Sequence, residues 1–448
     1  MHKKKKVIII GCGVAGISSA VELALQGYDI EIFESKNILG GRVYSIFDEH
    51  SGEEHDNGQH ILSGAYHQFN KILKLLGTEN LVKEQKNLRV IFSYPNGERD
   101  VLDGAPLKGK LGLLFALLKL KKLGIKSKFR ILKFFINVLL KRLIIKNQTV
   151  RELLLANQQT DETIQRFWEP LALATLNASI DSAPALLLIE VIKRAFFAEK
   201  ESSRLILPKV GLSSLLEPFP QWLSKNGGKI NFGESVKKII VSDKKALAIE
   251  TKSGKHYYAD YFISTVQPNS LSKILSNSDL DITEFEMLKS FQHSTIISIY
   301  LWLDKELKGI DFSAMIGTKT QWLFNRREIL DGTPIKENQF KGHIALTISA
   351  ADDLSNEDKE KLANICYEEV KQCFPALKEA KILHKIVVKD KFATVKLTTE
   401  NYHLRPKTKT LISNFFLAGD WTDTNLPATI EGAAVSGLIA SESIKKLQ

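Results

Sequence analysis

The stretch VIIIGCGVAG, from Val7 to Gly16, decides the fold of this chain. Its first four residues are β-branched and apolar, a composition typical of a buried parallel strand. Gly11, Gly13 and Gly16 follow at once. The first permits a tight turn, the second lets backbone approach a pyrophosphate, and the third allows a helix to pack closely on the strand. We therefore expect a dinucleotide at the start of that helix, where free N–H groups face the phosphates.

A second strand is expected from Ile30 to Phe33, and it is followed by Glu34. The spacing places this carboxylate where an acidic residue binds ribose hydroxyls. An acid at that place repels a 2′-phosphate, so the pattern favours FAD or NAD over NADP. A glycine-rich turn without a ligand is the alternative interpretation.

Two further motifs select between the two dinucleotides. LGGR stands at Leu39 to Arg42, and Gly419-Asp420 opens a glycine-rich segment near the other end of the chain. Both resemble motifs of the amine oxidase and carotenoid desaturase group of flavoproteins. The resemblance implies FAD, with the paired glycines against the cofactor and Arg42 on its phosphate or on the flavin-side loop. It also implies that Asp420 binds the ribityl or pyrophosphate region.

The two ends of the chain are therefore expected to build one FAD cradle, and related flavoproteins contact adenine through backbone where Val236 stands. The chain has one glycine fingerprint and no second one for NADPH, so electrons reach or leave the flavin through the substrate, oxygen or an external donor. The expected FAD-binding residues are Gly11, Gly13, Val14, Ala15, Gly16, Glu34, Ser35, Gly40, Gly41, Arg42, Gly58, Val236, Gly419, Asp420, Thr429, Ile430, Gly432 and Ala433.

The expected fold class is α/β. A Rossmann-like FAD-binding domain is interleaved with a mixed-sheet substrate domain and a helical basic subdomain, as in amine oxidases and phytoene desaturases. Alternating apolar residues from Ser294 to Leu303 and from His343 to Ser349 predict the substrate-domain sheet. The expected boundaries are 1–70, 206–270 and 406–448 for the FAD domain, 71–205 for the helical subdomain and 271–405 for the substrate domain.

The net charge of +11 is concentrated in residues 107–146. This segment holds ten lysines, two arginines and no acid, whereas basic and acidic residues are nearly equal in number elsewhere. Bulky apolar residues are interleaved with the charges at helical spacing, which is typical of a helix at an anionic membrane surface. Helices that cover the core with a solvated basic face are the alternative. Nucleic acid is disfavoured as a partner because the segment is too apolar and has no recognisable binding module.

No part of the sequence indicates a membrane-spanning helix, which needs about 20 consecutive apolar residues. The longest comparable stretch is Leu111 to Leu118, and no secretory signal is visible. Cys12, Cys366 and Cys373 have neither metal-ligand nor redox-pair spacing, so we expect no metal site and a reducing compartment. The expected location is the cytoplasm, with peripheral association at the inner face of the cell membrane.

Five internal strings narrow the resemblance to the bacterial hydroxysqualene dehydroxylases, and it covers nearly the full chain. The strings DNGQH and WEPL are the more discriminating parts. The five strings are DNGQHILSGAY (Asp56 to Tyr66), RFWEPLALATLNA (Arg166 to Ala178), LPKVGLSSL (Leu207 to Leu215), TQWLFNR (Thr320 to Arg326) and GDWTDTNLPATIEGAAVSG (Gly419 to Gly437).

The resemblance implies a reductive reaction that converts hydroxysqualene to squalene in hopanoid or isoprenoid biosynthesis. The hydroxyl is allylic, so its departure leaves a delocalised cation that hydride from N5 of reduced FAD quenches. The protein would polarise the hydroxyl, exclude water and align the carbon with N5. A long-chain isoprenoid substrate also agrees with a membrane-facing basic segment.

The resemblance also implies candidate residues for the chemistry. Asn57, Gly58, Gln59 and His60 match a loop that passes close to the isoalloxazine ring, and His60 is the candidate proton donor. A simple hydrogen bond from His60 to the flavin or to backbone is the alternative, and core packing is the alternative for each tryptophan below. The residues expected to line the substrate tunnel are Trp168, Asn177, Gln321, Trp322 and Trp421.

Two other functions remain open. An oxidative carotenoid desaturase or an amine oxidase would share the fold and the cofactor. A non-enzymatic prenyl-lipid carrier would share the architecture without needing flavin, although the intact glycines, Glu34, Arg42 and Asp420 argue against it.

Overall fold

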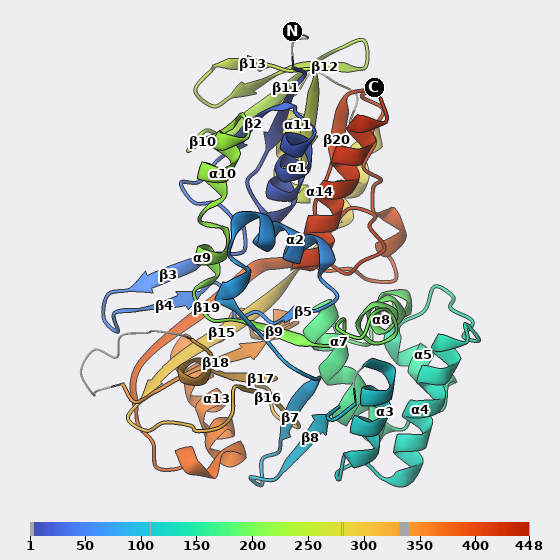
Figure 1. The fold of residues 1–448 in the computed structure, drawn as a ribbon, viewed down its shortest axis with the longest axis vertical. Helices are drawn as coiled ribbons and strands as arrows, with labels where there is room; N and C mark the ends of the chain where they lie inside the picture. Colours follow the sequence, from blue (N-terminus) through green and yellow to red (C-terminus); the bar gives the residue numbers. More distant parts are fainter. Residues whose placement is uncertain (1–3, 108, 279, 281, 331–339, 448) are drawn as a thin grey trace.

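In a computed structural model the chain forms an elongated molecule with two main sheets, one above the other along its long axis (Figure 1). The structure describes residues 4–107, 109–278, 280, 282–330 and 340–447. Lys108, which belongs to the basic segment, lies outside the described residues.

The upper sheet in Figure 1 is parallel throughout and has the strand order β10-β2-β1-β14-β20. Its central strands are almost fully buried and rich in isoleucine and phenylalanine, as expected for a parallel sheet covered on both faces. Three distant segments of the chain supply its strands, which are β1 (Lys6–Ile10), β2 (Asp29–Glu34), β10 (Gly228–Phe232), β14 (Tyr261–Ser264) and β20 (Phe415–Leu417).

Helices from the two ends of the chain pack together beside this sheet. The first is α1 (Val14–Leu25) and the last is α14 (Ile430–Lys445). The hydroxyl of Ser18 donates a hydrogen bond to the carbonyl of Ala434 at 2.6 Å. A third helix, α2 (His67–Leu76), lies against α14. The two ends of the chain are therefore held in one unit.

Shorter elements surround this unit. They are β3 (Ser45–Asp48), β4 (Glu53–Asp56), β5 (Leu62–Ser63), β6 (Val82–Glu84), β9 (Leu205–Pro208), α9 (Leu212–Leu216), α10 (Phe219–Lys225), β11 (Val236–Ser242), β12 (Lys245–Thr251), β13 (His256–Tyr258) and α11 (Pro268–Ser276).

The lower sheet has seven strands in the order β19-β15-β18-β17-β16-β7-β8. One face packs against α13 (Lys359–Cys373): alternate residues of the long strand, such as Ile297, Ile299 and Leu301, share a core with that helix. The other face looks toward the upper unit. The strands are β7 (Arg89–Ser93), β8 (Arg99–Asp103), β15 (His293–Leu303), β16 (Phe312–Met315), β17 (Trp322–Asn325), β18 (Gly342–Ile348) and β19 (Ile382–Val395), and α12 (Arg326–Ile329) follows β17.

Two of these strands correct the expected boundaries. Strands β7 and β8 lie within residues 71–205, which the sequence assigned to a helical subdomain, yet they extend the substrate sheet, because β7 pairs with β16 and β8 pairs with β7. The pairing of β7 with β16 is parallel and joins residues more than 200 positions apart, which no local sequence pattern reveals.

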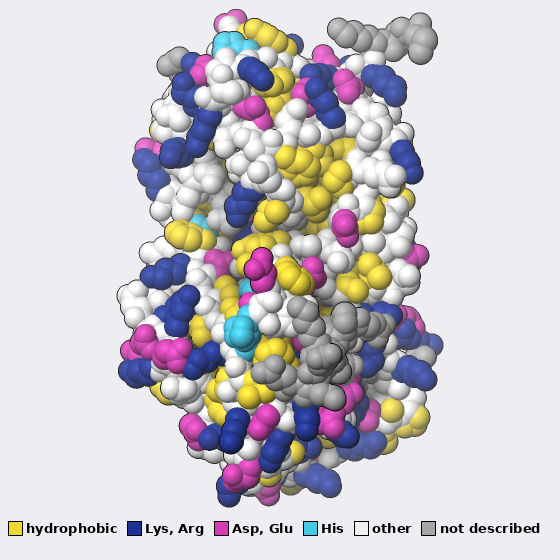
Figure 2. Space-filling view, turned by 90° about the vertical axis from the view of Figure 1, so that its left-hand side faces the viewer, with side chains coloured by type: hydrophobic (Ala, Val, Ile, Leu, Met, Phe, Trp, Pro, Cys, Tyr) yellow, Lys and Arg dark blue, Asp and Glu magenta, His cyan; other side chains and the backbone are white. Residues whose placement is uncertain are grey.

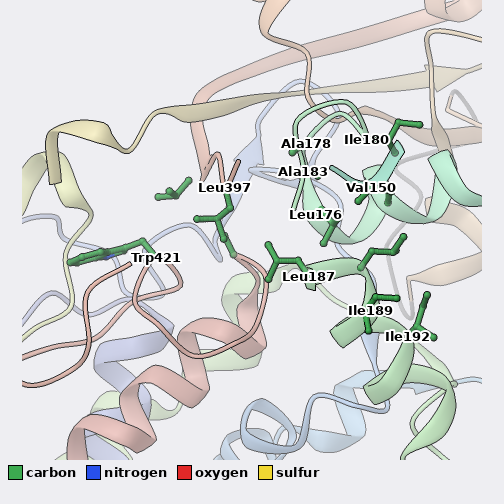
Figure 3. Close-up of a cluster of buried hydrophobic side chains, with 14 of the residues drawn as sticks. Val150, Leu176, Ala178, Ile180, Ala183, Leu187, Ile189, Ile192, Leu397 and Trp421 are labelled. Carbon is green, nitrogen blue, oxygen red and sulfur yellow. The ribbon is translucent and has the colours of Figure 1, made fainter. Parts of the chain in front are cut away.

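Most of the remainder of that segment is helical, and its buried side chains belong to a core that continues into both main sheets (Figure 3). Leu187, Ile189 and Ile192 of α8 pack with Val150 of α5, while Leu397 and Trp421 extend the cluster toward the C-terminal segment. The helices are α3 (Gly109–Lys119), α4 (Ile125–Leu139), α5 (Val150–Ala156), α6 (Asp161–Thr163), α7 (Glu169–Leu176) and α8 (Ala185–Ile192), with single π-helical turns at Ile164–Trp168 and Lys193–Phe197.

None of the helices within the described residues is long and apolar enough to cross a membrane. Nor do those residues bring together three or more His, Cys, Asp or Glu side chains that could hold a metal ion.

Candidate active site

Two glycine turns meet at the carboxyl end of β1 and form a narrow cradle. A Cβ atom on Gly41 would lie 3.1 Å from the Cα of Gly13, and Gly41 has φ +66°, a conformation that favours glycine. Gly13 is the N-cap of α1 and no side chain caps that helix. Its first N–H groups are therefore free to bind an anion, and their dipole favours a pyrophosphate.

Glu34 closes the cradle at its outer side. One carboxylate oxygen accepts the N–H of Cys12 at 2.8 Å, and the other accepts the N–H of Lys36 at 2.9 Å. The hydroxyl of Ser35 also donates to the second oxygen at 3.2 Å. These bonds fix the carboxylate at the end of β2 while the oxygen bonded to Cys12 keeps a further lone pair. Val236 lines the same end, because the N–H of Glu234 is bonded to the Glu34 carbonyl at 3.0 Å. This arrangement fits the ribose and adenine of a dinucleotide.

The C-terminal motif completes the cradle from the opposite end of the chain. Asp420 and Arg42 form an ion pair at 2.8 Å, and Arg42 also donates to the carbonyl of Ala393 at 3.0 Å. The pair joins the LGGR turn to the Gly-Asp motif and to β19 of the lower sheet. It therefore positions both of the residues that the sequence predicted to hold the flavin side of FAD.

Sequence reasoning missed Arg405, which organises the loop after Asp420. This buried guanidinium donates to the carbonyl of Leu426 at 2.9 Å, to the hydroxyl of Thr424 at 3.2 Å and to the carbonyl of Thr422. Burial lowers the pKa of Arg405. No motif surrounds the residue in the sequence, and its partners follow it by about twenty positions, so no local signal could have identified it.

A continuous cavity of about 1020 Å³ runs from the cradle to the lower sheet. This volume is at the upper end of the range for ligand sites and leaves space beside a bound dinucleotide. The predicted residues that line it are Gly11, Gly13, Val14, Ala15, Glu34, Ser35, Gly40, Gly41, Arg42, Asn57, Gly58, Gln59, His60, Asn177, Val236, Trp322, Gly419, Asp420, Trp421, Thr429, Ile430 and Ala433.

Two predicted FAD-binding glycines lie outside the cavity lining. A Cβ atom on Gly16 would lie 2.2 Å from the carbonyl oxygen of Gly11, and one on Gly432 would lie 2.5 Å from that of Pro427. Both glycines serve the close packing of a helix start on the preceding loop. Their role at the cofactor is therefore indirect.

Two predicted substrate residues also lie elsewhere. Trp168 is fully buried in the helical unit, where its indole N–H donates to Gln159 at 2.8 Å and its ring packs against Phe134 at 4.9 Å between centroids. Gln321 is held by two hydrogen bonds of 2.9 Å to the backbone of Ser349. The expectation that both line the tunnel is corrected, since each side chain is committed to internal structure.

A buried ion pair supports the flavin-side loop from behind. Arg326 is 1% exposed and contacts Asp56 at 3.2 Å, Gln59 at 2.6 Å and the carbonyl of Glu54 at 2.8 Å. Tyr300 adds a hydrogen bond from its hydroxyl to the Asp56 carbonyl at 2.8 Å. Gln59 is thus held by Arg326, and the loop is fixed by bonds within the protein. Asp56 belongs to DNGQHILSGAY and Arg326 to TQWLFNR, two of the segments on which the resemblance rests, but only the fold shows that the two residues pair.

His60 has its Nδ1 atom 2.5 Å from the carbonyl oxygen of Gly58. A carbonyl only accepts hydrogen bonds, so Nδ1 carries the proton and Nε2 is left as an acceptor in the neutral ring. Burial lowers the pKa of His60, partly offset by the Gly58 carbonyl and by Asp56. At neutral pH this histidine is therefore better suited to accept a hydrogen bond than to donate a proton.

A second polar group lies on the cavity wall beside His60. The hydroxyl of Tyr44 donates to Asn57 at 3.1 Å, and the amide of Asn57 donates to Asp390 of β19 at 3.0 Å. All three residues line the cavity. Tyr44 and Asp390 were not predicted from the sequence, and Asp390 is three residues from Ala393, the backbone partner of Arg42.

Glu431 makes the stability of the folded protein depend on pH. It is 3% exposed in the first turn of α14 and accepts the N–H groups of Gln68 and Phe69 at 2.9 Å each. Burial outweighs these bonds and raises the pKa of Glu431 to about 7. Its contribution to stability is thus complete below the ordinary pKa of 4.5 and is lost as pH rises through 7.

We expect Glu431→Gln to remove this dependence. Between pH 4.5 and pH 8 the wild type should lose about 3 kcal/mol of unfolding free energy relative to the variant, because glutamine does not ionise. Thermal unfolding of both proteins across this pH range measures the effect. Parallel curves for the two proteins would show that Glu431 titrates normally.

Comparison with known proteins agrees with the geometry of the cradle. The family model for flavin containing amine oxidoreductases matches residues 14–445. The chain is 26% identical to hydroxysqualene dehydroxylase of Zymomonas mobilis, over 97% of each protein. It is also 26% identical to zeta-carotene desaturase of Arabidopsis thaliana, over 98% of this chain and 85% of that protein.

Solved structures show the same fold. An oxidoreductase from Methanosarcina mazei superposes with a TM-score of 0.75 at 19% identity, covering 98% of this chain and all of the other. A triple mutant of putrescine oxidase gives a TM-score of 0.74 at 13% identity, with 99% of each chain covered. The free N-terminus of α1, the fixed carboxylate of Glu34 and the glycine cradle fit FAD. The chain therefore belongs to the flavin containing amine oxidoreductase family and is an FAD-dependent oxidoreductase.

Proposed function

We propose that the protein converts hydroxysqualene to squalene by reductive removal of the allylic hydroxyl. The observation that carries this proposal is similarity over almost the full length of both chains to hydroxysqualene dehydroxylase, without a large segment left over on either side. Hydroxysqualene dehydroxylases of Rhodopseudomonas palustris and Sinorhizobium fredii match at 26% and 25% identity, each over 98% of both proteins.

Each turnover of the proposed reaction consumes one hydride and one proton and releases one molecule of water. The C–O bond would break as the hydroxyl takes up a proton that comes ultimately from solvent and leaves as water, and reduced FAD, when bound, would supply the hydride for the new C–H bond. Because this chemistry would consume the two electrons of the reduced flavin, an external donor would have to return two electrons for each turnover. The described glycine turns provide one dinucleotide site, which agrees with a separate donor.

The chain's own residues orient the substrate and exclude water. Trp322 and Phe324 of β17 line the lower part of the cavity, and Trp421 lies beside the Gly-Asp motif. Their aromatic faces suit a hydrocarbon chain. Tyr44, Asn57 and Asp390 line the same cavity and form a hydrogen-bonded chain, so their polar atoms can hold one hydroxyl group of the substrate.

We expect Asp390→Asn to lower turnover about 30-fold, because a hydrogen bond to a charged carboxylate contributes about 2 kcal/mol. FAD content should not change, since Asp390 is not part of the glycine cradle. Single-turnover kinetics with chemically reduced protein measure the loss, and His60→Ala is the matched comparison. A larger loss of turnover in His60→Ala than in Asp390→Asn would show that His60, and not Asp390, contributes more to the reaction.

An oxidative carotenoid desaturase is the second candidate, favoured by the similarity to zeta-carotene desaturase. The same cavity would accept that hydrocarbon, with electrons flowing into the flavin instead of out of it. Coverage separates the dehydroxylase from the plant desaturase, of which 85% is matched, but not from 15-cis-phytoene desaturase of Synechococcus elongatus, of which 95% is matched at 24% identity.

Lipid analysis tests the proposed reaction in cells. Cells that make hydroxysqualene should accumulate squalene when this chain is co-expressed, and they should retain hydroxysqualene when a Gly13→Val variant replaces it. Equal squalene levels with the wild type and with the variant would overturn the proposal.

A further inference from the structure

We propose that the protein docks on an anionic membrane through one face of α3 and α4, an interaction that goes beyond the reaction proposed above. The docking face is defined by apolar side chains that remain exposed. They are Leu111 and Leu118 of α3, Ile125, Phe129 and Ile136 of α4, and Leu140 at its end.

Helix α4 is apolar on two opposite faces. Its inner face, with Ile131, Phe134 and Phe135, is buried against the helical unit. Its outer face carries Ile125 and Phe129, which are 76% and 70% exposed. A helix on the surface of a soluble protein presents charged and polar residues there.

The exposed apolar residues of α4 form a single stripe. Ile125, Phe129, Ile136 and Leu140 are separated by four, seven and four positions, which places them on one side of a helix with 3.6 residues per turn. They are 43% exposed or more. A stripe of this kind has the geometry of a helix that lies in a membrane plane with one side among the acyl chains.

Basic residues border the stripe on both sides. By the same helical geometry, Lys126 and Lys133 follow one edge and Lys128 follows the other. Among the described basic residues of segment 107–146, Lys122 alone forms an ion pair, with Glu98. The other described cations have no carboxylate partner, although Lys128 donates to the carbonyl of Leu118 at 2.9 Å. The long side chains of Lys126 and Lys133 can therefore reach past the apolar stripe to anionic headgroups.

Charge and apolarity together select one occupant for this face. Segment 107–146 contains no acid, so a second copy of the chain docked there would bring like charges together. Nucleic acid would leave the apolar stripe without a partner. The face turned to the viewer in Figure 2 differs, since acidic and basic side chains are set beside one another and among the hydrophobic ones. An anionic bilayer satisfies both the stripe and the cations.

The docking face is joined to the cavity wall by a packed aromatic cluster. Phe135 of α4 contacts Trp168 and Phe167, with centroids 5.4 Å and 6.2 Å apart. The chain continues from Trp168 directly into α7, and Ala174 of that helix lines the cavity. Docking would therefore hold the apolar cavity next to the bilayer, where an isoprenoid substrate resides.

Co-sedimentation of the FAD-loaded protein with lipid vesicles tests this inference without any substrate, so the result does not depend on the proposed reaction. The two vesicles are phosphatidylcholine alone and phosphatidylcholine with phosphatidylglycerol. We expect at least about tenfold tighter binding to the anionic vesicles. The double variant Phe129→Ser/Ile136→Ser should lose about tenfold or more of that affinity, and Lys126→Gln/Lys133→Gln should lose the preference for phosphatidylglycerol.

The matched control is Phe47→Ser, because Phe47 is 60% exposed on β3, away from α4 (Figure 1). The control should bind like the wild type, and all variants should keep their FAD, which shows that they are folded. The inference would be overturned by equal binding of the wild type to both vesicles or by no binding to either. Wild-type affinity of Phe129→Ser/Ile136→Ser would also overturn it, since the face would then attract polyanions by charge alone.

Discussion

Gly13→Val should abolish FAD binding while leaving the fold intact. The backbone at Gly13 has φ −77°, which valine adopts, and a Cβ atom there has only the Cα of Gly41 nearby, at 3.8 Å. The isopropyl group would therefore fit the protein but fill the cradle where the pyrophosphate must approach. We expect the dissociation constant for FAD to rise at least about 100-fold, which corresponds to about 3 kcal/mol.

Gly124→Val is a matched control for this variant. Gly124 is also a helix N-cap without a side-chain cap, has φ −62°, and its Cβ atom would meet no atom closer than 3.8 Å, the distance to Glu162. Flavin absorbance after gel filtration measures occupancy in both proteins. Full flavin content in Gly13→Val would show that the cofactor does not pass over the start of α1.

Arg326→Leu should destabilise the protein by about 3–5 kcal/mol, because it leaves the carboxylate of Asp56 buried without its charged partner. Both side chains are 1% exposed. The bond from Arg326 to Gln59 is lost as well, so the loop of Asn57 to His60 should lose its fixed position. Chemical denaturation should show the loss of stability, and FAD-loaded protein should show a disturbed flavin spectrum.

Two further variants separate the buried charge from general effects. Adding Asp56→Asn to Arg326→Leu removes the unpaired carboxylate and should restore part of the lost stability. Arg194→Leu breaks a surface pair with Glu190 and should cost less than about 1 kcal/mol. A loss in Arg326→Leu as small as in Arg194→Leu would contradict the assigned role of the buried pair.

The glycine cradle could be predicted from the sequence because most of the residues that form it lie at short, fixed spacings along the chain. Gly11 to Gly16 define a strand, a turn and a helix start, and Glu34 follows at a fixed spacing. The resemblance of Gly419-Asp420 to a flavoprotein motif indicated that the dinucleotide is FAD. The structure brings Asp420 to within 2.8 Å of Arg42.

The residues that sequence reasoning missed act through long-range pairing. Arg326 meets Asp56 across 270 positions and Asp390 meets Asn57 across 333, so neither contact leaves a periodic signal. For Trp168 the error is of the opposite kind, because the sequence predicted a functional residue where the structure has a core residue. It stands in a discriminating string, yet its indole is bonded to Gln159 inside the helical core. Resemblance identified the segment, but only packing decides whether a side chain faces a cavity or a core.

The direction of electron flow is the central claim, and an anaerobic single-turnover experiment tests it most directly. Protein with chemically reduced FAD is mixed with hydroxysqualene, and the flavin spectrum and the lipids are followed together. We predict that the flavin is oxidised as squalene forms, one molecule for each flavin. Reduced flavin that persists beside unchanged hydroxysqualene, together with reduction of the oxidised protein by phytoene, would contradict the account and identify a desaturase.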